Sequence, residues 1–297
     1  MKKSNGEKIF NFINIVFMFL LCLVMVYPYI NSLAVSFNDS KDTMLGGITF
    51  YPRIFSADSY KVVLKDPIVI RAFLISISRS IAGTLIALIV TSGAAYAITK
   101  KRLPGRKMIL MFLTIPMFIS GGLIPMFILF RYIHFLNNFL VYIIPGAFSI
   151  YNMHVIRTYF NTIPSSLEES ALIDGANETI IFFKVMLPLS KPVLATVTLW
   201  VIVGNWNDWL TTLYFIQNQN LYPLQYVLMK LIRESEMLQK MIAESVMKGL
   251  SISRTPSVTP QSIQAATLIV ATLPVVISYP FLQKYFVKGV MIGSVKE

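Results

Sequence analysis

The sequence predicts an all-α integral membrane protein with six transmembrane helices, and three observations lead to that prediction. Of its 297 residues, 55% are hydrophobic and only 13% are charged. A soluble domain carries about a quarter charged residues, so this chain lacks the polar surface needed to cover a water-soluble globule. The apolar residues also gather into long runs, each sufficient to cross a hydrocarbon core about 30 Å thick. Basic residues cluster at the ends of these runs, as in membrane proteins of known orientation.

The apolar runs define six spans within a single transmembrane domain that covers residues 1–297. The spans are 9–36, 68–99, 108–132, 139–160, 193–216 and 263–286. The first run is longer than the apolar core of a signal peptide, and no clear small-residue cleavage site follows it. We therefore expect a retained first helix.

The orientation follows from a basic link between the second and third spans. Its basic residues are Lys100, Lys101, Arg102, Arg106 and Lys107. The positive-inside rule places this link in the cytoplasm. The two termini and the segment 161–192 are then cytoplasmic, and the segment 217–262, which carries an amphipathic helix, is extracellular. We interpret the net charge of +12 as this bias and expect no nucleic-acid partner.

Few residues are suited to metal or cofactor chemistry. Cys22 is the only cysteine, so neither an internal disulfide nor a multi-thiolate metal site can form. His134 and His154 are isolated from each other along the chain. We expect no metal and no cofactor on this chain.

The second span carries a charge well inside its ends. Arg79 lies beside a stripe of small residues, which is typical of close helix packing in membranes. The stripe consists of Ser76, Ser80, Gly83, Ala87, Thr91 and Ala94. A charge at this depth is expected to face the bundle interior or water. Arg79 is therefore either a residue of the transport path or a structural ion-pair partner of another subunit.

The cytoplasmic segment between the fourth and fifth spans is too polar to cross a membrane. Ser165 and Glu168 have the spacing of a capping box that starts a helix. Gly175 suits the left-handed position that ends it. A second helix is predicted to begin near Asn177 and to stop at Pro188. Helices this short are not stable alone, so both must pack against something, and the pair forms a handle for a cytoplasmic partner.

The same segment carries a motif with fixed spacing. It reads Glu-Ser-Ala at 169–171, Asp-Gly-Ala at 174–176, and then a Phe and two Pro. This pattern resembles the EAA motif of bacterial ABC import permeases, with Ser170 in place of the usual Ala. The motif residues that the resemblance assigns to ATPase coupling are Glu169, Ala171, Asp174, Gly175, Ala176, Phe182 and Pro188.

The resemblance extends along most of the chain. Ala-Ala-Tyr-Ala at 94–97 and Leu-Pro-Gly-Arg at 103–106 are similar to the family's second span and the link after it. Asn-Trp-Asn-Asp-Trp at 205–209 resembles its fifth-span signature. The stretch 279–289 resembles the C-terminal signature of carbohydrate-uptake permeases, and the chain is most similar to the branch that handles oligosaccharides or polysaccharide fragments.

The resemblance implies a complex in the bacterial cytoplasmic membrane. No Gly-x-x-x-x-Gly-Lys-Ser/Thr loop occurs in the sequence, so this chain does not hold ATP in that way. The implied partners are a second related permease, two ATPase subunits that bind ATP and Mg²⁺, an extracellular solute-binding protein, a carbohydrate and membrane lipid. This chain is expected to be a transport subunit and not an enzyme.

The fifth span supplies candidate residues for the substrate path. They are Asn205, Trp206, Asn207, Asp208 and Trp209, together with Arg79. Amides and carboxylates suit sugar hydroxyls, and tryptophan can stack on the apolar face of a sugar. The same residues are equally compatible with interfacial anchoring or subunit contact.

Two other classes of function remain open from the residues. An ion-coupled secondary transporter would show acidic residues within its spans and often internal repeats; Asp208 is the only acidic candidate, and no repeat is visible. A membrane-embedded enzyme would need a paired nucleophile and base or a metal set, and no such constellation is visible.

Overall fold

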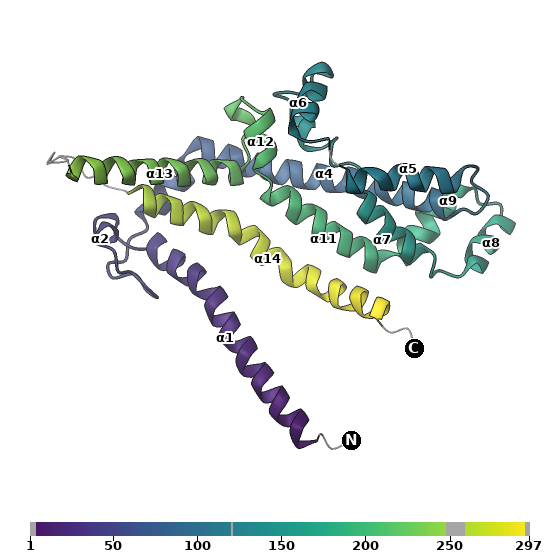
Figure 1. Ribbon diagram of the computed structural model, residues 1–297, viewed down its shortest axis with the longest axis horizontal. Coiled ribbons are helices and arrows are strands. Elements are labelled where there is room, and N and C mark those ends of the chain that lie inside the picture. The colour runs from purple at the N-terminus through teal and green to yellow at the C-terminus, as the bar shows by residue number, and fades with distance from the viewer. Residues whose placement is uncertain (1–3, 120, 248–258, 295–297) are drawn as a thin grey trace. The chain divides into compact units, whose positions relative to one another are not determined.

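The computed structural model describes residues 4–119, 121–247 and 259–294 (Figure 1). Within these ranges the chain is helical apart from turns, loops and one isolated bridge between Asn38 and Phe55. It divides into two compact units, one formed by Met1–Ile70 and Val227–Leu273 and the other by Arg71–Tyr226 and Pro274–Glu297. We call them unit one and unit two.

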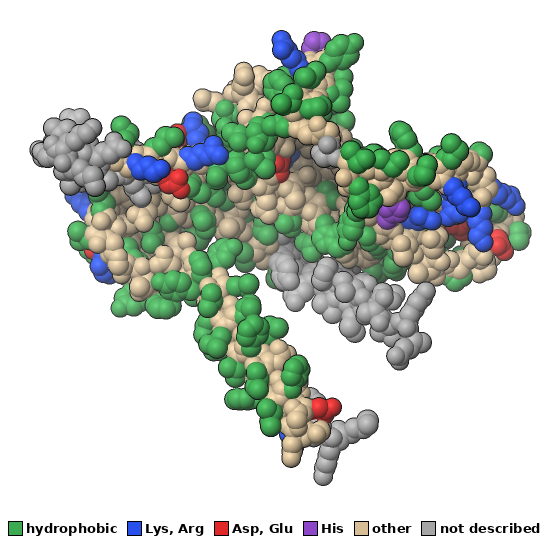
Figure 2. Space-filling model, in the orientation of Figure 1, with side chains coloured by type: hydrophobic (Ala, Val, Ile, Leu, Met, Phe, Trp, Pro, Cys, Tyr) green, Lys and Arg blue, Asp and Glu red, His purple; other side chains and the backbone are tan. Residues whose placement is uncertain are grey.

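Unit one contains a long first helix whose apolar side chains are exposed. Its elements are α1 (Asn5–Ser36), α2 (Ser40–Met44), α3 (Asp58–Lys65), most of α13 (Leu224–Met247) and the first part of α14 (Pro260–Ser294). Hydrophobic side chains cover α1 along its length (Figure 2), and among its residues only Ala34, Val35 and Ser36 are buried. Helix α13 confirms the helix predicted in 217–262, of which residues 248–258 lie outside the described ranges.

Unit two is built around α4. It contains most of α4 (Pro67–Thr99), the part of α14 from Pro274 onward, and the elements between α4 and α13. Those elements are α5 (Arg106–Phe118), α6 (Leu123–Tyr132), η1 (Phe139–Tyr142), α7 (Ile150–Phe160), α8 (Ser165–Ile173), α9 (Glu178–Ile181), η2 (Phe182–Met186), α10 (Leu187–Leu189), α11 (Lys191–Asn207), α12 (Leu210–Phe215) and η3 (Gln219–Leu221). Helix α7 packs against both α5 and α11. One apolar cluster joins the C-terminal part of α4 to α7, α9, η2 and α11. A second joins η1 to α6 and α12.

The small residues of α4 serve helix packing within this unit. Ser76, Ser80, Ala87 and Thr91 are buried, and Ser76 Oγ accepts a 2.8 Å hydrogen bond from the Leu224 N–H. Gly83 faces Asn205 so closely that a Cβ placed there would lie 2.7 Å from the Asn205 amide nitrogen. Packing, as the sequence predicts, is therefore the role of this stripe.

Six continuous spans are not confirmed. Among the described residues, three helices are long and apolar enough to cross a membrane: α1, α4 and the Pro260–Ile277 part of α14. Two further spans are possible if each of two bent helix pairs crosses the membrane once. These pairs are α5 with α6, bent by 116°, and Glu178–Leu189 with α11, bent by 83°. The prediction of one helix over 139–160 is wrong, because η1 and α7 share that range with an irregular stretch between them.

Local hydrogen bonding explains why these apolar runs break. The Asn138 side chain accepts from the Leu140 N–H at 3.0 Å and starts η1, and Ser149 Oγ accepts from the Asn152 N–H at 3.3 Å and starts α7. Such side chains offer the backbone an alternative to a continuous helix. Gly122, with φ of +81° and ψ of 179°, takes an extended conformation with positive φ, which essentially only glycine adopts, directly before α6. Hydropathy does not register these breaks, because the flanking residues are apolar on both sides.

The contact between Gly83 and Asn205 predicts a large difference between two glycines of α4. Gly83→Leu must displace Asn205, and overpacking of this kind costs about 1–3 kcal/mol of stability. Gly93→Leu meets open space, since no atom lies within 4 Å of a Cβ there. We expect a lower thermal unfolding midpoint of the purified complex for Gly83→Leu only. Equal midpoints for the two variants would contradict this packing.

Candidate functional site: the coupling segment and the broken fifth span

Helix α8 ends in the turn that the sequence predicts. Asp174 is its C-cap, and Gly175 follows with φ of +81°. The Gly175 N–H donates to the Leu172 carbonyl at 3.0 Å, and the Ala176 N–H donates to the Ala171 carbonyl at 2.9 Å. These two bonds form a Schellman motif, which requires a left-handed residue at the position of Gly175.

The start of α8 differs from the prediction. Pro164 is the N-cap, Ser165 is already helical, and no side chain caps the helix. The carboxylate of Glu168 accepts instead from Lys100 Nζ at 2.6 Å. The predicted capping box is therefore wrong, because an ammonium is a stronger partner for this carboxylate than a backbone N–H.

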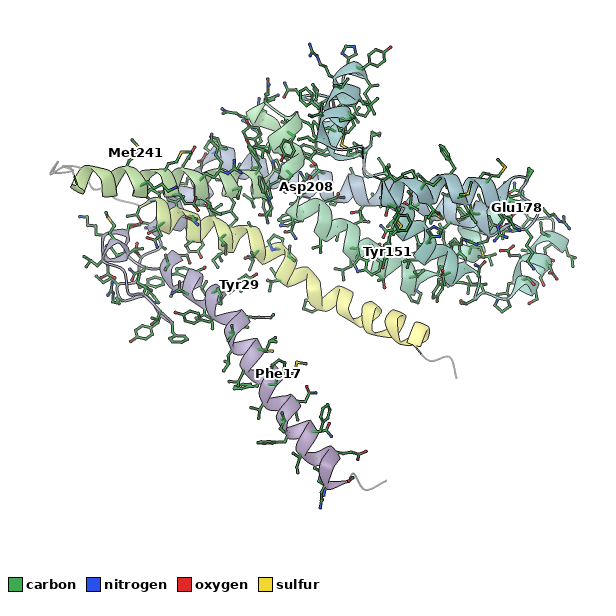
Figure 3. The ribbon with its side chains drawn as sticks, viewed as in Figure 1. Phe17, Tyr29, Tyr151, Glu178, Asp208 and Met241 are labelled. Atoms are coloured by element: carbon green, nitrogen blue, oxygen red, sulfur yellow. The ribbon has the colours of Figure 1, made fainter. Side chains whose placement is uncertain are left out.

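Lys100 ties the end of α4 to α8 and α9. Its ammonium lies 2.6 Å from Glu168, 2.9 Å from Glu178 and 4.2 Å from the centre of the Tyr96 ring. The Tyr96 hydroxyl donates to Glu178 at 2.6 Å. We call these four residues the Lys100 cluster, and Glu178 marks its place beside α8 and α9 in Figure 3. Sequence reasoning missed it, because Lys100 was counted only as a basic residue of the link.

The pKa shifts in this cluster agree with its hydrogen bonds. Burial lowers the pKa of Lys100, but the hydrogen bonds to Glu168, Tyr96 and Glu178 outweigh burial and raise it above its ordinary value. Hydrogen bonds from Tyr96 and Lys100 lower the pKa of Glu178. The Lys100–Glu178 ion pair is therefore charged at neutral pH, and it weakens in acid as Glu178 is protonated.

The second short helix begins as predicted and ends later. The Asn177 side chain caps α9 by accepting from the Ile180 N–H at 2.8 Å. The helix does not stop at Pro188 but continues through the π-turn η2 into α10, and the Leu187 N–H donates to the Phe182 carbonyl five residues earlier. Proline lacks an N–H and its ring clashes with the carbonyl four residues before it, and the wider π-turn relieves that conflict. The helix ends at Ser190, where α11 begins in a direction bent by 83°.

The motif residues divide between two faces of the segment. Phe182 is buried, with its ring centre 5.3 Å from that of Tyr96, and Ala171 and Ala176 pack partly against the same cluster. Glu169 and Asp174 are exposed. The exposed apolar side chains are Leu167, Leu172, Ile173, Ile180 and Phe183, with Ile173 86% exposed. The segment is thus anchored on one face and presents apolar and acidic groups on the other, as a partner-binding surface does.

Arg79 has its counter-charge within the chain. The side chain is 2% exposed, and its Nη2 lies 3.1 Å from Asp208 Oδ2. The guanidinium also donates to the backbone carbonyls of Asp208, at 2.7 Å, and of Asn205, at 2.8 Å. It lies 4.7 Å from the centre of the Tyr142 ring. The sequence left open a role in the transport path or an ion pair with another subunit; the ion pair that the structure shows is instead within the chain, with a partner 129 positions away.

This ion pair caps both ends of the break in the fifth span. Helix α11 ends at Asn207, where its last carbonyls have no helical donors, and Arg79 supplies donors with a positive charge at the negative end of the helix dipole. Asp208 Oδ1 accepts from the Thr211 N–H at 3.1 Å in the first turn of α12. In Figure 3, Asp208 lies where these two helices meet.

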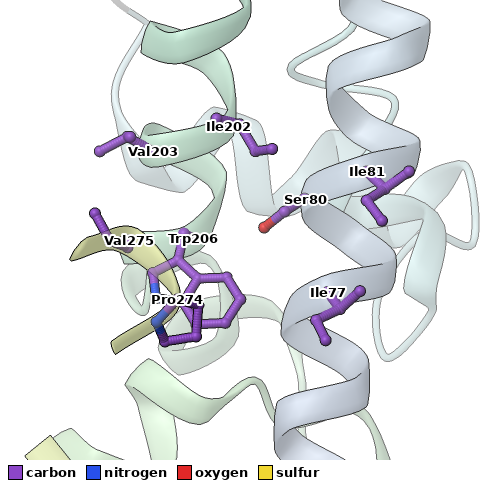
Figure 4. Close-up of a pocket in the computed structure, with 8 residues that line it drawn as sticks. All are labelled: Ile77, Ser80, Ile81, Ile202, Val203, Trp206, Pro274 and Val275. Carbon is purple, nitrogen blue, oxygen red and sulfur yellow. The ribbon is translucent and has the colours of Figure 1, made fainter. Parts of the chain in front are cut away.

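The other substrate-path candidates of the fifth span differ in how far they are buried. Trp206 is buried and lines an apolar cavity of about 230 Å³ (Figure 4). The cavity is lined by Ile77, Ser80, Ile81, Ile202, Val203, Trp206, Pro274 and Val275. This apolar lining suits a sugar's hydroxyl groups poorly. Asn207 is exposed and accepts from Gln225 Nε2 at 3.3 Å, while Trp209 is partly buried.

Comparison with known proteins identifies the family. Residues 100–292 match the model of the binding-protein-dependent transport system inner membrane component. The chain belongs to this family. It is 33% identical over 293 residues, 98% of this chain and 99% of the relative, to the polygalacturonan/rhamnogalacturonan transport system permease protein YtcP of Bacillus subtilis. It is 27% identical to the arabinooligosaccharides transport system permease protein AraQ of Halalkalibacterium halodurans, over 93% of each chain.

A solved structure has the same fold. The crystal structure of a bacterial ABC transporter involved in the import of the acidic polysaccharide alginate contains a chain that is 29% identical, with a TM-score of 0.84. The match covers 96% of this chain and 99% of that one. This protein is therefore a permease subunit of an ABC importer and not an enzyme, and it works in the inner membrane with an ATPase and a solute-binding protein.

The ion pair of Arg79 predicts which substitution at the break is harmful. Asp208→Asn leaves a buried guanidinium without its counter-charge, which we expect to cost about 3 kcal/mol, near the low end for such pairs because the Asp208 side chain is 33% exposed. Asn207→Ala, at the exposed neighbouring position, is the matched control. Thermal unfolding of the purified complex should show a lower midpoint for Asp208→Asn alone. A midpoint for Asp208→Asn equal to that of the control would show that the pair does not hold the break.

Proposed function

We propose that this chain is one of two related permease subunits of an importer that carries an oligosaccharide, released from a polysaccharide, into the cytoplasm. The observation that carries the proposal is the full-length similarity to permeases whose names specify polysaccharides or oligosaccharides. The second permease would complete the channel, and two ATPase subunits would bind ATP and Mg²⁺.

In this proposal the coupling segment, residues 161–192, faces the cytoplasm. Five of the eight residues of the link 100–107 are basic, and the positive-inside rule then places both termini on the same side. The exposed face of α8 and α9 would dock into an ATPase subunit, with Ile173 as its most exposed apolar side chain and Glu169 and Asp174 beside it. The Lys100 cluster and Phe182 would hold the opposite face against the membrane helices.

The geometry supports a route for transmitting motion. ATPase closure would displace α8 and α9, and the Schellman turn at Gly175 fixes the angle between them. From the bend at Ser190, α11 extends for 17 residues, about 25 Å, to the break that Arg79 caps. A helix that moves as one body between two joints couples distant sites without changing its own structure.

The substrate-path residues divide into two roles in this proposal. Asn207 and Trp209 would face the path, because Asn207 is exposed and Trp209 only partly buried. Arg79, Asn205, Trp206 and Asp208 would position them through the contacts at the break. Sugar hydroxyls would then meet amide groups, and a pyranose ring could stack on tryptophan.

Reconstitution tests the transport function. The permease pair, the ATPase and the binding protein would be placed in proteoliposomes and offered oligogalacturonides and arabino-oligosaccharides separately. We expect ATP-dependent uptake of at least one class, with ATP hydrolysis stimulated by the loaded binding protein. Uptake of a saccharide driven by an ion gradient without ATP would contradict the proposal, as would ATP hydrolysis by the isolated chain.

Gly175 provides a test of the coupling segment. A Cβ at Gly175 meets no atom within 4 Å, so the penalty of Gly175→Val comes from the left-handed backbone alone, about 1 kcal/mol or more. We expect Gly175→Val to abolish uptake at near-normal membrane abundance. Gly175→Asn is the control, because asparagine tolerates this conformation and should retain uptake. Normal transport by Gly175→Val would remove Gly175 from the coupling mechanism.

A further inference from the structure

The chain that leaves α1 folds back along it. Asn31, in α1, donates from Nδ2 to the carbonyls of Ile48 at 2.7 Å and Thr49 at 3.1 Å. The Phe50 ring meets the Tyr27 ring edge-on, with centres 5.3 Å apart. The return therefore reaches nine residues back from the end of α1 at Ser36, about 13 Å along the helix.

The fold-back loop, residues 45–55, is held in a defined conformation. Arg53 donates from Nε to Asp42 Oδ2 at 2.9 Å and from Nη2 to the Gly46 carbonyl at 2.7 Å. The buried Asn38 side chain accepts from the N–H groups of Arg53, at 2.8 Å, and Ile54, at 3.0 Å. The backbone of this loop is thus held by hydrogen bonds within unit one.

The fold-back loop carries large apolar side chains that are exposed. Leu45 is 81% exposed, Phe50 62% and Tyr51 72%. Rigid loops in water rarely expose side chains of this size together, and such a patch marks an interaction surface. The patch continues onto α1, where Tyr27 and Tyr29 are also exposed (Figure 3 labels Tyr29).

The position of the exposed apolar patch along α1 indicates that it lies at the membrane boundary. Residues 9–26 of α1 are predominantly apolar, and 18 residues extend about 27 Å, close to the thickness of the hydrocarbon core. Tyr27 and Tyr29 follow this stretch, and tyrosine prefers the membrane–water boundary. Because Phe50 contacts Tyr27, the fold-back loop lies at that boundary.

We propose that the fold-back loop is a membrane-interface anchor, in which Phe50 and the neighbouring Tyr51 insert between the headgroups and upper acyl chains of phospholipids. Its bonds to Asn31 satisfy two backbone carbonyls that would be costly to leave unpaired at this depth. The anchor fixes the depth of α1, whose 32 residues extend about 48 Å and exceed the hydrocarbon core. The inference requires only that α1 crosses the membrane, and it is independent of the substrate, the partner set and the orientation.

Spin labels measure the depth directly. The exposed Cys22 would be replaced by serine, and single cysteines would be placed by Phe50→Cys, Phe17→Cys and Lys61→Cys in the assembled complex. In vesicles of phosphatidylethanolamine and phosphatidylglycerol, the ratio of oxygen to nickel-chelate collisions rises with depth. We expect the ratio at position 50 to lie between those at position 17, within the apolar part of α1, and position 61, a 67% exposed lysine on α3. A ratio at position 50 equal to that at position 61 would overturn the proposal.

A matched pair of variants tests the fold-back itself. Asn31→Ala removes both bonds to the loop, whereas Ser32→Ala removes only a bond to Pro28 within α1. We expect Asn31→Ala to shift the ratio at position 50 to that of position 61, and Ser32→Ala to leave it unchanged. An unchanged ratio in Asn31→Ala would contradict the proposal. Water-like accessibility at position 50 that is lost only when the binding protein is added would also overturn it, in favour of a protein-docking surface.

Discussion

The capping of a helix break by a buried arginine is the constraint on which the arrangement of unit two depends. A backbone that leaves the helix at membrane depth needs partners for its free carbonyls, because no water supplies them there. Arg79 donates to the carbonyls of Asn205 and Asp208, and the Asp208 carboxylate balances its charge. The absence of a side chain at Gly83 leaves the space that Asn205 occupies. Together these contacts fix α4, α11 and α12 around one point.

The features that the sequence predicted correctly are those that depend on neighbouring residues. The Gly175 turn, the Asn177 cap and the long helices α1, α4 and α14 follow from residue types within a few positions of each other. The side-chain partners that the sequence did not predict are set by contacts between positions far apart in the chain. Glu168 is a capping residue by spacing, but Lys100, 68 positions away, is its partner.

The broken spans show the same limit for hydropathy. A hydropathy window counts apolar residues and does not detect a side chain such as Asn138 or Ser149 that offers the backbone a local bond. The sequence rule predicts that the helix stops at Pro188, because proline clashes with the preceding turn. The helix continues instead, because the wider π-turn η2 makes room for the proline ring. The partner of Arg79 lies 129 positions away, so no local pattern could supply it.

The two ends of α11 differ in how firmly charge holds them. At the break, the Arg79 side chain is 2% exposed, and separating it from Asp208 would leave a desolvated charge, which is strongly unfavourable. At the coupling segment, the side chains of Lys100, Glu168 and Glu178 are 24%, 23% and 59% exposed, so none of these charges is as fully removed from water as Arg79. Contacts that water can reach are easier to break and remake than an ion pair whose guanidinium is desolvated. In the proposed mechanism, the coupling segment would therefore be the joint that moves, and the break capped by Arg79 would be the joint that stays fixed.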